Sequence, residues 1–459
     1  MITSINDFKK PFFIGVAGVG MSAIAQYLQG IGKDVSGSDR FFVPGEYNET
    51  KEKLEMEGIQ CFLQNGDGIT PDTDLIVAST AIEDIVPEMQ KARKLNIPII
   101  RRSELLALIA KSKTTIAVGG TSGKSTTSAM LFDILEFAGL KPSIISGAGL
   151  ISIIKTGKIG NAKVGEGDLL VIEADESDGS IVQYKPKIGL LLNIDKDHQE
   201  IEELMNVFAE FKNNSEKFVV NQSHALAKHL SQNSDHDFSS DAINHPAGFM
   251  ATDFHQQGLE ITFKINGVDF ALHQVGKHNM ENALAATAIA NQLGVDLSVC
   301  AEALKNYEGI FRRHQVLGNK KGVWVIDDYA HNPVKCAAAI QACQPVADKV
   351  IAWFQPHGYK PTKFLRTDFV NEIANALRPQ DEIWMSEIFY AGGTAVKDIS
   401  ANDLINDLKA LGKSAFFVEK RKDFLKTVRP HLTDDCVLLL MAARDPSLEQ
   451  FARHTWEEL

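Results

Sequence analysis

A glycine-rich stretch between Gly119 and Ser125 has the residue types and spacing of a phosphate-binding loop. An apolar run at residues 115–118 predicts a strand before it, and an apolar-periodic helix follows it. At such a helix start backbone N–H groups can hold phosphates, Lys124 can reach the β- and γ-phosphates, and Ser125 can ligate Mg²⁺. The usual pattern has glycine where this chain has Val118, so the match is to a shorter variant. A plain turn with an exposed lysine is the alternative, but strand, glycines, lysine, serine and helix together favour phosphate binding.

Two clusters of oxygen-bearing side chains follow other predicted strands. Residues 173–178 read EADESD, and residues 193–198 read NIDKDH. Ligands bind at the carboxyl ends of strands in open α/β sheets, and a divalent cation that bridges phosphates needs oxygen ligands there. We therefore expect Glu173 to bind a metal, and also His198, because it lies beside the acidic loop. An acidic surface turn and a structural or surface histidine are the alternatives.

Polar residues also gather before a later helix and near the last domain boundary. Residues 276–282 read GKHNMEN, where Asn279 or Asn282 could cap the helix or touch a nucleotide base. The segments RRH and DDYAHNP lie within residues 312–333. An arginine there could stabilise charge on a transferring phosphoryl group, and Asp328 could accept hydrogen bonds from ribose hydroxyls. An interdomain salt bridge explains these two segments equally well.

The first glycine-rich loop, residues 15–20, reads GVAGVG and is similar to a dinucleotide loop, although its order is GxxGxG. Such a loop is a weak sign by itself. Asp39 ends the next predicted strand, so the two features together suggest a site for the phosphates and ribose of a nucleotide. A nicotinamide cofactor is the competing ligand.

These motifs need parallel sheets wound with helices, and short apolar runs do alternate with helix-like segments along the chain. Strands are expected at residues 12–16, 34–38, 75–78, 98–100, 115–118, 169–172, 188–192, 323–326, 350–353, 383–385 and 437–441. Helices are expected at residues 21–30, 124–138 and 280–293, with a surface excursion at 222–249 and a hairpin at 255–272. Because 459 residues exceed the usual size of one core, we expect three α/β domains, residues 1–108, 109–315 and 316–459.

Composition narrows the class of partner. The formal net charge of −12 argues against a broad nucleic-acid surface or an anionic membrane, but it leaves room for a local basic pocket for phosphates. Five scattered cysteines without CxxC spacing predict reduced thiols that pack in the core. The first ten residues lack the order of a signal peptide, and residues 12–32 are interrupted by glycines, so we expect a cytoplasmic protein without a membrane span.

In order along the chain, the segments GVAGVGMS, SGSD, GGTSGKSTT, EADESDGS, NIDKDH, GKHNMENA, RRHQ and DDYAHNP resemble the motifs of the Mur ligases of peptidoglycan synthesis. The resemblance covers essentially the whole chain and is greatest to the UDP-N-acetylmuramate:L-alanine ligases and the related murein-peptide recycling ligases. It implies a Rossmann-like N-terminal domain for a UDP-sugar and a central P-loop ATPase-type α/β domain for ATP. A C-terminal Rossmann-like domain would close on both and bring the amine, in a monomer or a homodimer.

The resemblance also implies roles for individual residues. The UDP-sugar substrate would be bound by Gly18, Gly20, Met21, Ser22, Asp39 and His357. ATP would be bound by Gly120, Thr121, Ser122, Gly123, Lys124, Ser125, Thr126, Asn279, Asn282, Arg313 and Asp328. Mg²⁺ would be bound by Ser125, Glu173 and His198. The catalytic residues would be Lys124, Glu173, His198, Arg313 and His331.

The implied reaction follows from the weakness of a carboxylate as an electrophile. Transfer of the γ-phosphate of ATP would turn the carboxylate into an acyl phosphate, with the developing charge spread over Mg²⁺ and Lys124. An amino acid or peptide amine would then attack, and phosphate would leave. Closure of the third domain would keep water away from the acyl phosphate.

Three segments depart from the pattern of the alanine-adding enzymes. Their GTHGKTTT has a histidine where this chain has Ser122, and their DDYGHHP differs here at Ala330 and Asn332, while His331 is kept. Their PHRYTRT corresponds to residues 356–362, PHGYKPT, which lack both arginines expected near the substrate carboxylates. We therefore hypothesise that the acceptor amine differs from L-alanine.

Three alternative functions remain. The acceptor could be a preformed murein peptide, as in recycling. The chain could be a non-catalytic Mur-like nucleotide-binding paralogue, although the intact Lys124, Ser125, Glu173 and His198 speak against it. An NAD-dependent oxidoreductase built on the first glycine loop leaves the phosphate loop unexplained.

Overall fold

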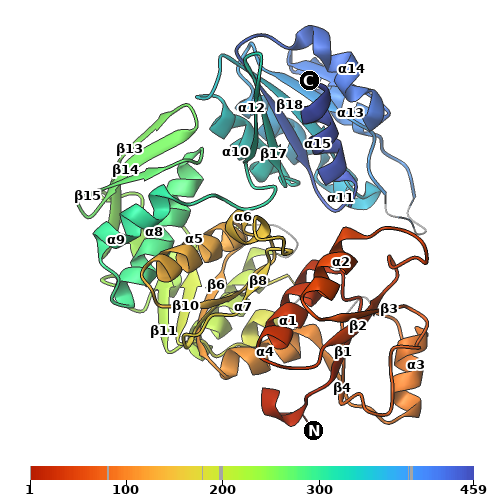
Figure 1. Cartoon of the computed structure of the whole chain (residues 1–459). Helices are drawn as coiled ribbons and strands as arrows, with labels where there is room; N and C mark the ends of the chain where they lie inside the picture. The colour runs from red at the N-terminus through yellow and green to blue at the C-terminus, as the bar shows by residue number, and fades with distance from the viewer. Residues whose placement is uncertain (1, 80–81, 178, 196–199, 391, 393–395) are drawn as a thin grey trace. The chain divides into compact units, whose positions relative to one another are not determined.

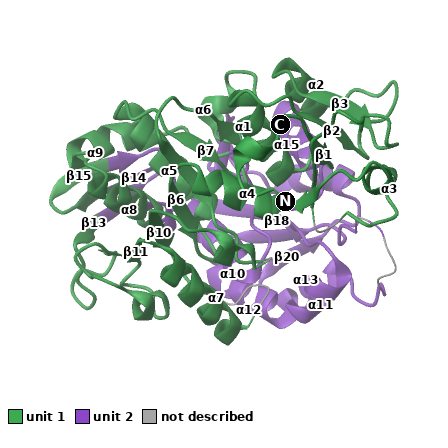
Figure 2. Ribbon diagram, turned by 90° about the horizontal axis from the view of Figure 1, so that it is seen from below, with its two compact units in different colours: residues 1–253, 263–270, 281–310 green, residues 254–262, 271–280, 311–459 purple. Residues whose placement is uncertain are grey.

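The computed structural model describes residues 2–79, 82–177, 179–195, 200–390, 392 and 396–459. The chain, drawn whole in Figure 1, forms two compact units, which Figure 2 shows in different colours. Unit 1 comprises residues 1–253, 263–270 and 281–310, and unit 2 comprises residues 254–262, 271–280 and 311–459. None of the described helices is long and apolar enough to cross a membrane.

The first sheet of unit 1 has five parallel strands in the order β3-β2-β1-β4-β5. The strands are β1 (Pro11–Ile14), β2 (Ser36–Asp39), β3 (Gln60–Leu63), β4 (Leu75–Ala78) and β5 (Ile99–Arg101). The helices are α1 (Val19–Gly30), α2 (Glu49–Met56), α3 (Pro87–Lys94) and α4 (Arg102–Lys111). Phe13 and Val77 lie in one core cluster, whereas Phe12 and Ile76 lie in another. This alternation places helices on both faces of the sheet.

The second sheet of unit 1 has six strands in the order β11-β10-β6-β9-β7-β8, all parallel except β8. The strands are β6 (Thr114–Gly119), β7 (Ser143–Ile145), β8 (Ala162–Lys163), β9 (Leu169–Glu173), β10 (Ile188–Leu191) and β11 (Lys217–Val220). The helices of this part of the chain are α5 (Lys124–Phe137), α6 (Ile151–Ile154), α7 (Ile201–Asn214), α8 (Lys277–Gln292) and α9 (Leu297–Lys305). Because β6 lies between β9 and β10, the three motifs that follow these strands emerge side by side.

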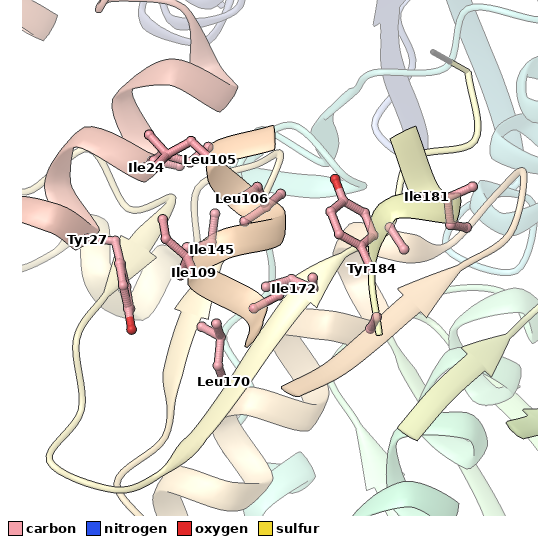
Figure 3. Packing of buried hydrophobic residues seen from close by; sticks show 14 of the residues in the cluster. Ile24, Tyr27, Leu105, Leu106, Ile109, Ile145, Leu170, Ile172, Ile181 and Tyr184 are labelled. Carbon is pink, nitrogen blue, oxygen red and sulfur yellow. The ribbon is translucent and has the colours of Figure 1, made fainter. Parts of the chain in front are cut away.

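One hydrophobic core joins the two sheets of unit 1 (Figure 3). Ile24 of α1 and Leu105 of α4 pack in the same cluster as Ile172 of β9, and all three are fully buried. Burying an aliphatic side chain of this size stabilises the fold by about 1.5–3 kcal/mol. A buried hydrogen bond of 2.7 Å from Gln26 Nε2 to Asn161 Oδ1 also connects the two parts.

A small sheet follows in the order β12-β13-β14-β15. Its strands are β12 (Phe238–Ser239), β13 (Phe249–Gln257), β14 (Glu260–Ile265) and β15 (Val268–Leu272). The sequence predicts only a hairpin at residues 255–272 here. The structure starts β13 earlier because Phe249 and Ala251 are buried, and the four exposed residues from Thr252 onward hide the alternation of that strand.

The sheet of unit 2 has the order β16-β17-β21-β18-β19-β20, in which only β16 is antiparallel. The strands are β16 (Gln315–Lys320), β17 (Val323–Asp328), β18 (Lys349–Gln355), β19 (Glu382–Met385), β20 (Ser414–Phe417) and β21 (Cys436–Ala442). The helices are α10 (Pro333–Cys343), α11 (Tyr359–Phe364), α12 (Arg366–Ala376), α13 (Ala401–Ala410), α14 (Phe424–Val428) and α15 (Leu448–Glu458). Val437 and Leu439 face one core cluster and Leu438 and Leu440 face the other, as a doubly wound sheet requires.

Each strand expected from an apolar run is present, β4 with the expected ends and the others with shifted ends, and the chain is α/β throughout, as predicted. The five cysteines are free, and four of them are buried. The domain boundaries at residues 108 and 315 stay predictions.

Candidate active site

The phosphate-loop motif lies between β6 and α5, at the centre of the second sheet. Gly120 has φ +134° and Gly123 has φ +85°, conformations that side chains other than glycine rarely adopt. A Cβ atom at Gly123 would also come within 2.5 Å of Asn282 Oδ1. Asn282 accepts a hydrogen bond of 3.2 Å from Thr127 Oγ1. The absence of a side chain at Gly123 therefore leaves room for Asn282. The N-terminus of α5 that follows is suited to bind an anion.

Lys124 is the cation of this loop. Its Nζ donates hydrogen bonds of 2.7 Å to Gly120 O and to Glu176 Oε2, and it lies 4.0 Å from Asp175 Oδ1. Burial by itself lowers the pKa of Lys124, but the charges of Glu176 and Asp175 outweigh it and raise the pKa. Lys124 is therefore a cation at neutral pH, held at the start of α5 where phosphates would lie.

Glu173 ends β9 and faces the same helix start. Its Oε2 accepts from Ser125 Oγ at 2.9 Å, while its Oε1 accepts from Ser146 Oγ at 2.7 Å and from Gly147 N at 2.5 Å. A hydroxyl and a carboxylate oxygen in contact are hard ligands of the kind that Mg²⁺ takes alongside phosphate oxygens and water. Ser125 and Glu173 thus fit a magnesium site. His198, the other expected metal ligand, lies outside the described residues.

Asn193, which follows β10, fixes the shape of the phosphate loop. Its Oδ1 accepts from Ser122 N at 2.8 Å and from Thr121 Oγ1 at 2.9 Å, and its Nδ2 donates to Ser122 O at 3.0 Å. Asp195 N donates to Thr121 Oγ1 at 3.0 Å. Sequence reasoning gave Asn193 and Glu176 no role of their own, although both lie in motifs that it singled out. Their place at strand ends flanking β6 is the signal that could have found them.

The first glycine loop connects β1 to α1, and Asp39 holds it in place. Asp39 Oδ2 accepts from Ala17 N at 2.9 Å and Oδ1 accepts from Phe41 N at 3.0 Å, and the residue is 4% exposed. Met21 and Ser22 are buried on α1, and Ser22 Oγ donates to Val19 O at 3.0 Å. Asp39 therefore shapes the loop, and contacts of Gly18, Gly20, Met21, Ser22 and Asp39 with a UDP moiety stay predictions.

Unit 2 brings several other expected site residues together through aromatic contacts. The guanidinium of Arg313 lies 4.5 Å from the centre of the Tyr329 ring. The His331 ring centre lies 5.5 Å from that of Tyr329 and 5.7 Å from that of His357. Asn279 Nδ2 donates to Val275 O at 2.8 Å. Arg313, His331 and His357 thus form one cluster, whose contacts with ATP or substrate stay predictions.

Asp328 lies in a buried network of the same unit. Its Oδ2 accepts from His314 N at 2.7 Å and lies 3.1 Å from His314 Nδ1, and its Oδ1 accepts from Ala330 N at 2.7 Å. The His278 ring centre lies 5.3 Å from that of His314. Burial alone would raise the pKa of Asp328, but the charge and hydrogen bonds of His314 hold it well below its usual range. Sequence reasoning missed this pair, because nothing in the spacing of RRH and DDY marks a buried contact.

Three family models match the chain in succession. They are "Mur ligase family, catalytic domain" over residues 12–114, "Mur ligase middle domain" over residues 118–290, and "Mur ligase, glutamate ligase domain" over residues 312–444. The UDP-N-acetylmuramate–L-alanine ligase of Carboxydothermus hydrogenoformans is 33% identical over 450 residues, covering 94% of this chain and 93% of the relative. That of Aquifex aeolicus is 34% identical and covers 95% of each chain.

Solved structures of two ligases also match this chain along nearly its whole length. The UDP-N-acetylmuramate–alanine ligase of Thermotoga maritima matches with a TM-score of 0.80 and 28% identity, over 98% of both chains. A murein peptide ligase of Psychrobacter arcticus matches with a TM-score of 0.66 and 19% identity, also over 98% of both chains, which shows a shared fold.

Proposed function

This chain belongs to the Mur ligase family, and from that premise we propose that it uses ATP to join the carboxylate of a UDP-N-acetylmuramate-type substrate to L-alanine or another amine. The matches to family models and to a solved structure confirm the family, the three-part α/β fold and the ligase class expected from the motifs. It also sets aside the oxidoreductase alternative. The family depends on ATP, whereas Mg²⁺, the acceptor and the role of each residue belong to the proposal.

The observation that carries the proposal is the meeting of Lys124, Ser125 and Glu173 at neighbouring strand ends. Lys124 is cationic and lies at the start of α5, and Glu173 contacts Ser125 Oγ at 2.9 Å. An acid-activating ligase must bind the phosphates of ATP and offset charge that grows on the transferred phosphoryl group. This edge of the sheet has the groups for both tasks.

Each residue then has a definite task. Lys124 donates to the β- and γ-phosphates, and Asn193 keeps the loop that surrounds them in shape. Ser125 and Glu173 would hold Mg²⁺, which would neutralise charge on the phosphate oxygens. The substrate carboxylate attacks the γ-phosphorus and becomes an acyl phosphate with release of ADP, and the amine then displaces phosphate.

Release of phosphate from MgATP tests the proposal directly. We expect release only when the full-length protein also receives UDP-N-acetylmuramate and an amine, and we expect Lys124→Met to reduce it about 10³-fold. Release that ignores the UDP-sugar would contradict the substrate assignment. No release with any amine would favour the non-catalytic paralogue.

A preformed peptide is the second candidate acceptor, and the segment after β18 favours it. Alanine-adding relatives are expected to have an arginine where this chain has Gly358, which precedes α11 as its N-cap and has φ +74°. An arginine in this backbone conformation would be strained. The segment therefore follows a path suited to glycine, with less positive charge and more space for a larger amine.

An amine panel distinguishes the two acceptors. The protein is supplied with MgATP and UDP-N-acetylmuramate, and L-alanine, other amino acids and a murein tripeptide are added one at a time. A higher kcat/KM for the tripeptide would assign the recycling reaction. If L-alanine is efficient and every larger amine is inert, the acceptor is L-alanine and the hypothesis of an altered acceptor is wrong.

A further inference from the structure

A cavity of about 590 Å³ lies within unit 1, away from the phosphate loop. Its walls come from α1, the C-terminal half of α5, α6 and residues 156–166, with Glu57 at one side. Asp133 of α5 lies nine residues after Lys124, or about 13 Å along the helix at 1.5 Å per residue. The cavity is therefore a separate site, and its volume suits a small molecule.

Several hydrogen-bond acceptors of this cavity are unsatisfied. Gln26 is 4% exposed, and its Oε1 has no hydrogen-bond partner among the described residues. Glu57 forms an ion pair with Lys158 at 3.0 Å, and Glu136 forms one with Lys163 at 2.6 Å. The second carboxylate oxygen of each glutamate is buried and has no hydrogen-bond partner within the described structure. An unpaired buried acceptor costs about 1–3 kcal/mol, so the same wall carries three such costs.

Asp133 adds a fourth acceptor group. No hydrogen bond or ion pair reaches its carboxylate from the part of the chain that the structure describes. Burial first, and then the nearby charges of Glu308 and Glu136, raise the pKa of Asp133 to about 7, against an opposing effect of Lys163. A positive charge placed in the cavity would remove this penalty.

The other residues that line the cavity indicate which chemical groups the ligand carries. Tyr27, Phe132, Ile153 and Val164 offer apolar surface beside the acceptors. The groups that need a partner accept hydrogen bonds, so the ligand must donate them. Four carboxylates and two lysines line the cavity, which leaves net negative charge above pH 7.

We propose that this cavity binds a small organic cation with two ammonium groups joined by a short carbon chain. The ammonium groups donate to Asp133 and to Gln26, Glu57 or Glu136, and the chain packs on Tyr27 and Phe132. The terminal torsions of glutamine and glutamate side chains are soft, so the buried oxygens can turn toward the ligand at little cost. The P-loop chemistry does not use these residues.

The site is connected to the start of α1. Gln26 Nε2 donates to Ser22 O at 2.9 Å and to Asn161 Oδ1 at 2.7 Å, and Asn161 Nδ2 donates to Val19 O at 2.8 Å and to Ser22 Oγ at 3.0 Å. A ligand on Gln26 Oε1 therefore acts on the turn expected to hold the UDP-sugar. Binding of the cation should therefore change the KM for the UDP-sugar. This expectation rests on the proposed function, whereas binding of the cation itself does not.

Calorimetric titration of the full-length protein with 1,4-diaminobutane at pH 8 tests the site without any substrate. We expect one diamine per chain, with butylamine at least about tenfold weaker because one charged hydrogen bond is lost. Asp133→Asn should weaken diamine binding about tenfold or more, and Glu210→Gln, the same charge change on an exposed residue of α7, should leave it within about twofold. Absence of binding, equal binding by butylamine, or equal losses in both variants would overturn the proposal.

Thermal unfolding without ligand supplies a second measurement. Because the half-buried carboxylate of Asp133 is charged at pH 8 and has no partner within the described residues, Asp133→Asn should raise the melting temperature of the unliganded protein and lose the further rise that diamine gives to the native chain. A lower melting temperature in Asp133→Asn would mean that the carboxylate supports the fold, and the site would be rejected. With calcium chloride in place of diamine, an equal rise would also reject an organic cation.

Discussion

The charged residues of unit 1 and unit 2 are used in opposite ways. At the phosphate loop the partners of Lys124 are one backbone oxygen and acidic side chains, and the side chain of Asp175 is 46% exposed. In unit 2 the side chains of His314 and Asp328 are 8% and 9% exposed, and Asp328 accepts hydrogen bonds on both oxygens. The side chains of Lys124 and Glu176 are 16% and 7% exposed, so the first group reaches solvent through Asp175, whereas the second is enclosed by its own partners.

The same contrast applies to the two arginines at the start of unit 2. Arg312 is buried against Asp327 at 2.9 Å and donates to Ala442 O at 2.9 Å. Arg313 instead lies over the ring of Tyr329. A charge whose hydrogen bonds are already made stabilises the fold, whereas a charge on a ring face still has donors to offer. Mutations at the phosphate loop should therefore affect catalysis, and mutations in the enclosed charge pairs of unit 2 should affect stability.

The largest effect is expected for Lys124→Met. It removes the charge at the start of α5 and keeps the length of the side chain, so phosphate release should fall about 10³-fold, which is about 4 kcal/mol of transition-state stabilisation. Lys187→Met is the control, since Lys187 pairs with Glu216 at the surface. Kinetics and circular dichroism of both variants measure the outcome. If Lys124→Met fails to fold while the control variant folds, then Lys124 has a structural role, and the contrast between the two units does not hold.

The next effect is on stability, for Asp328→Asn. The change leaves His314 buried without its counter-charge, and breaking a buried pair costs about 3–5 kcal/mol. All four tryptophans (Trp324, Trp353, Trp384 and Trp456) belong to unit 2, so tryptophan fluorescence in a urea titration follows this unit alone.

Asp434→Asn, an exposed position of the same unit, is the control for Asp328→Asn. It should change the free energy of unfolding by less than about 0.5 kcal/mol. If Asp328→Asn leaves the stability of unit 2 unchanged and raises the KM for ATP, then Asp328 binds ATP, as the resemblance implies, and the buried pair matters little.

The sheets were largely predictable because buried parallel strands appear as short apolar runs. The runs at residues 169–172 and 437–441 become β9 and β21 almost unchanged. The excursion at residues 222–249 was less predictable, since β12 has two residues and the first strand residues after it carry no alternation. Its hydrogen bonds to Asp237, such as the 2.9 Å bond from Val220 N, come from tertiary packing rather than from a local pattern.

For the site, the sequence predicted which strand ends carry chemistry but not which atoms meet. Glu173 and Ser125 could be placed together because β6 and β9 were expected in one sheet. The bond from Lys124 to Glu176 and the contact of His278 with His314 depend on side-chain directions over long sequence separations, which spacing does not encode. A buried histidine pair also resembles an ordinary polar turn in the sequence.

A smaller effect is expected for Ser125→Ala. Loss of one oxygen ligand should raise the Mg²⁺ concentration needed for half-maximal phosphate release about tenfold, with little change in stability. Ser128→Ala on the same helix is the control, because Ser128 Oγ is buried and makes no hydrogen bond within the described residues. An unchanged Mg²⁺ requirement in Ser125→Ala would show that the hydroxyl does not face the metal, and Glu173 would be the only proposed ligand left within the described chain.

The most gradual effect is the pH dependence of the stability of unit 2. Burial opposes protonation of His314, but Asp328 raises its pKa well above the usual value, so the folded state holds a proton that the unfolded state releases above about pH 6.5. Stability from this group is complete below pH 6.5 and falls by up to about 1.4 kcal/mol per pH unit as pH rises toward the folded pKa. Burial also raises the pKa values of Cys336 and Cys343, which would lower stability only above about pH 8.5.

Urea titrations of tryptophan fluorescence between pH 7.5 and 8.5 follow His314, because burial and the charge of His314 lower the pKa of His278 to about 3 and its opposing effect on stability has ended by about pH 7.5. His314 has φ +45°, which asparagine tolerates, so His314→Asn should fold and should have a nearly constant unfolding free energy across this range. His454→Asn, an exposed position on α15, should retain the slope of the native chain. A flat profile in the native chain would mean that His314 is neutral and that its contact with Asp328 is a plain hydrogen bond. The contrast of unit 2 with the phosphate loop would then rest on the enclosed pair of Arg312 and Asp327.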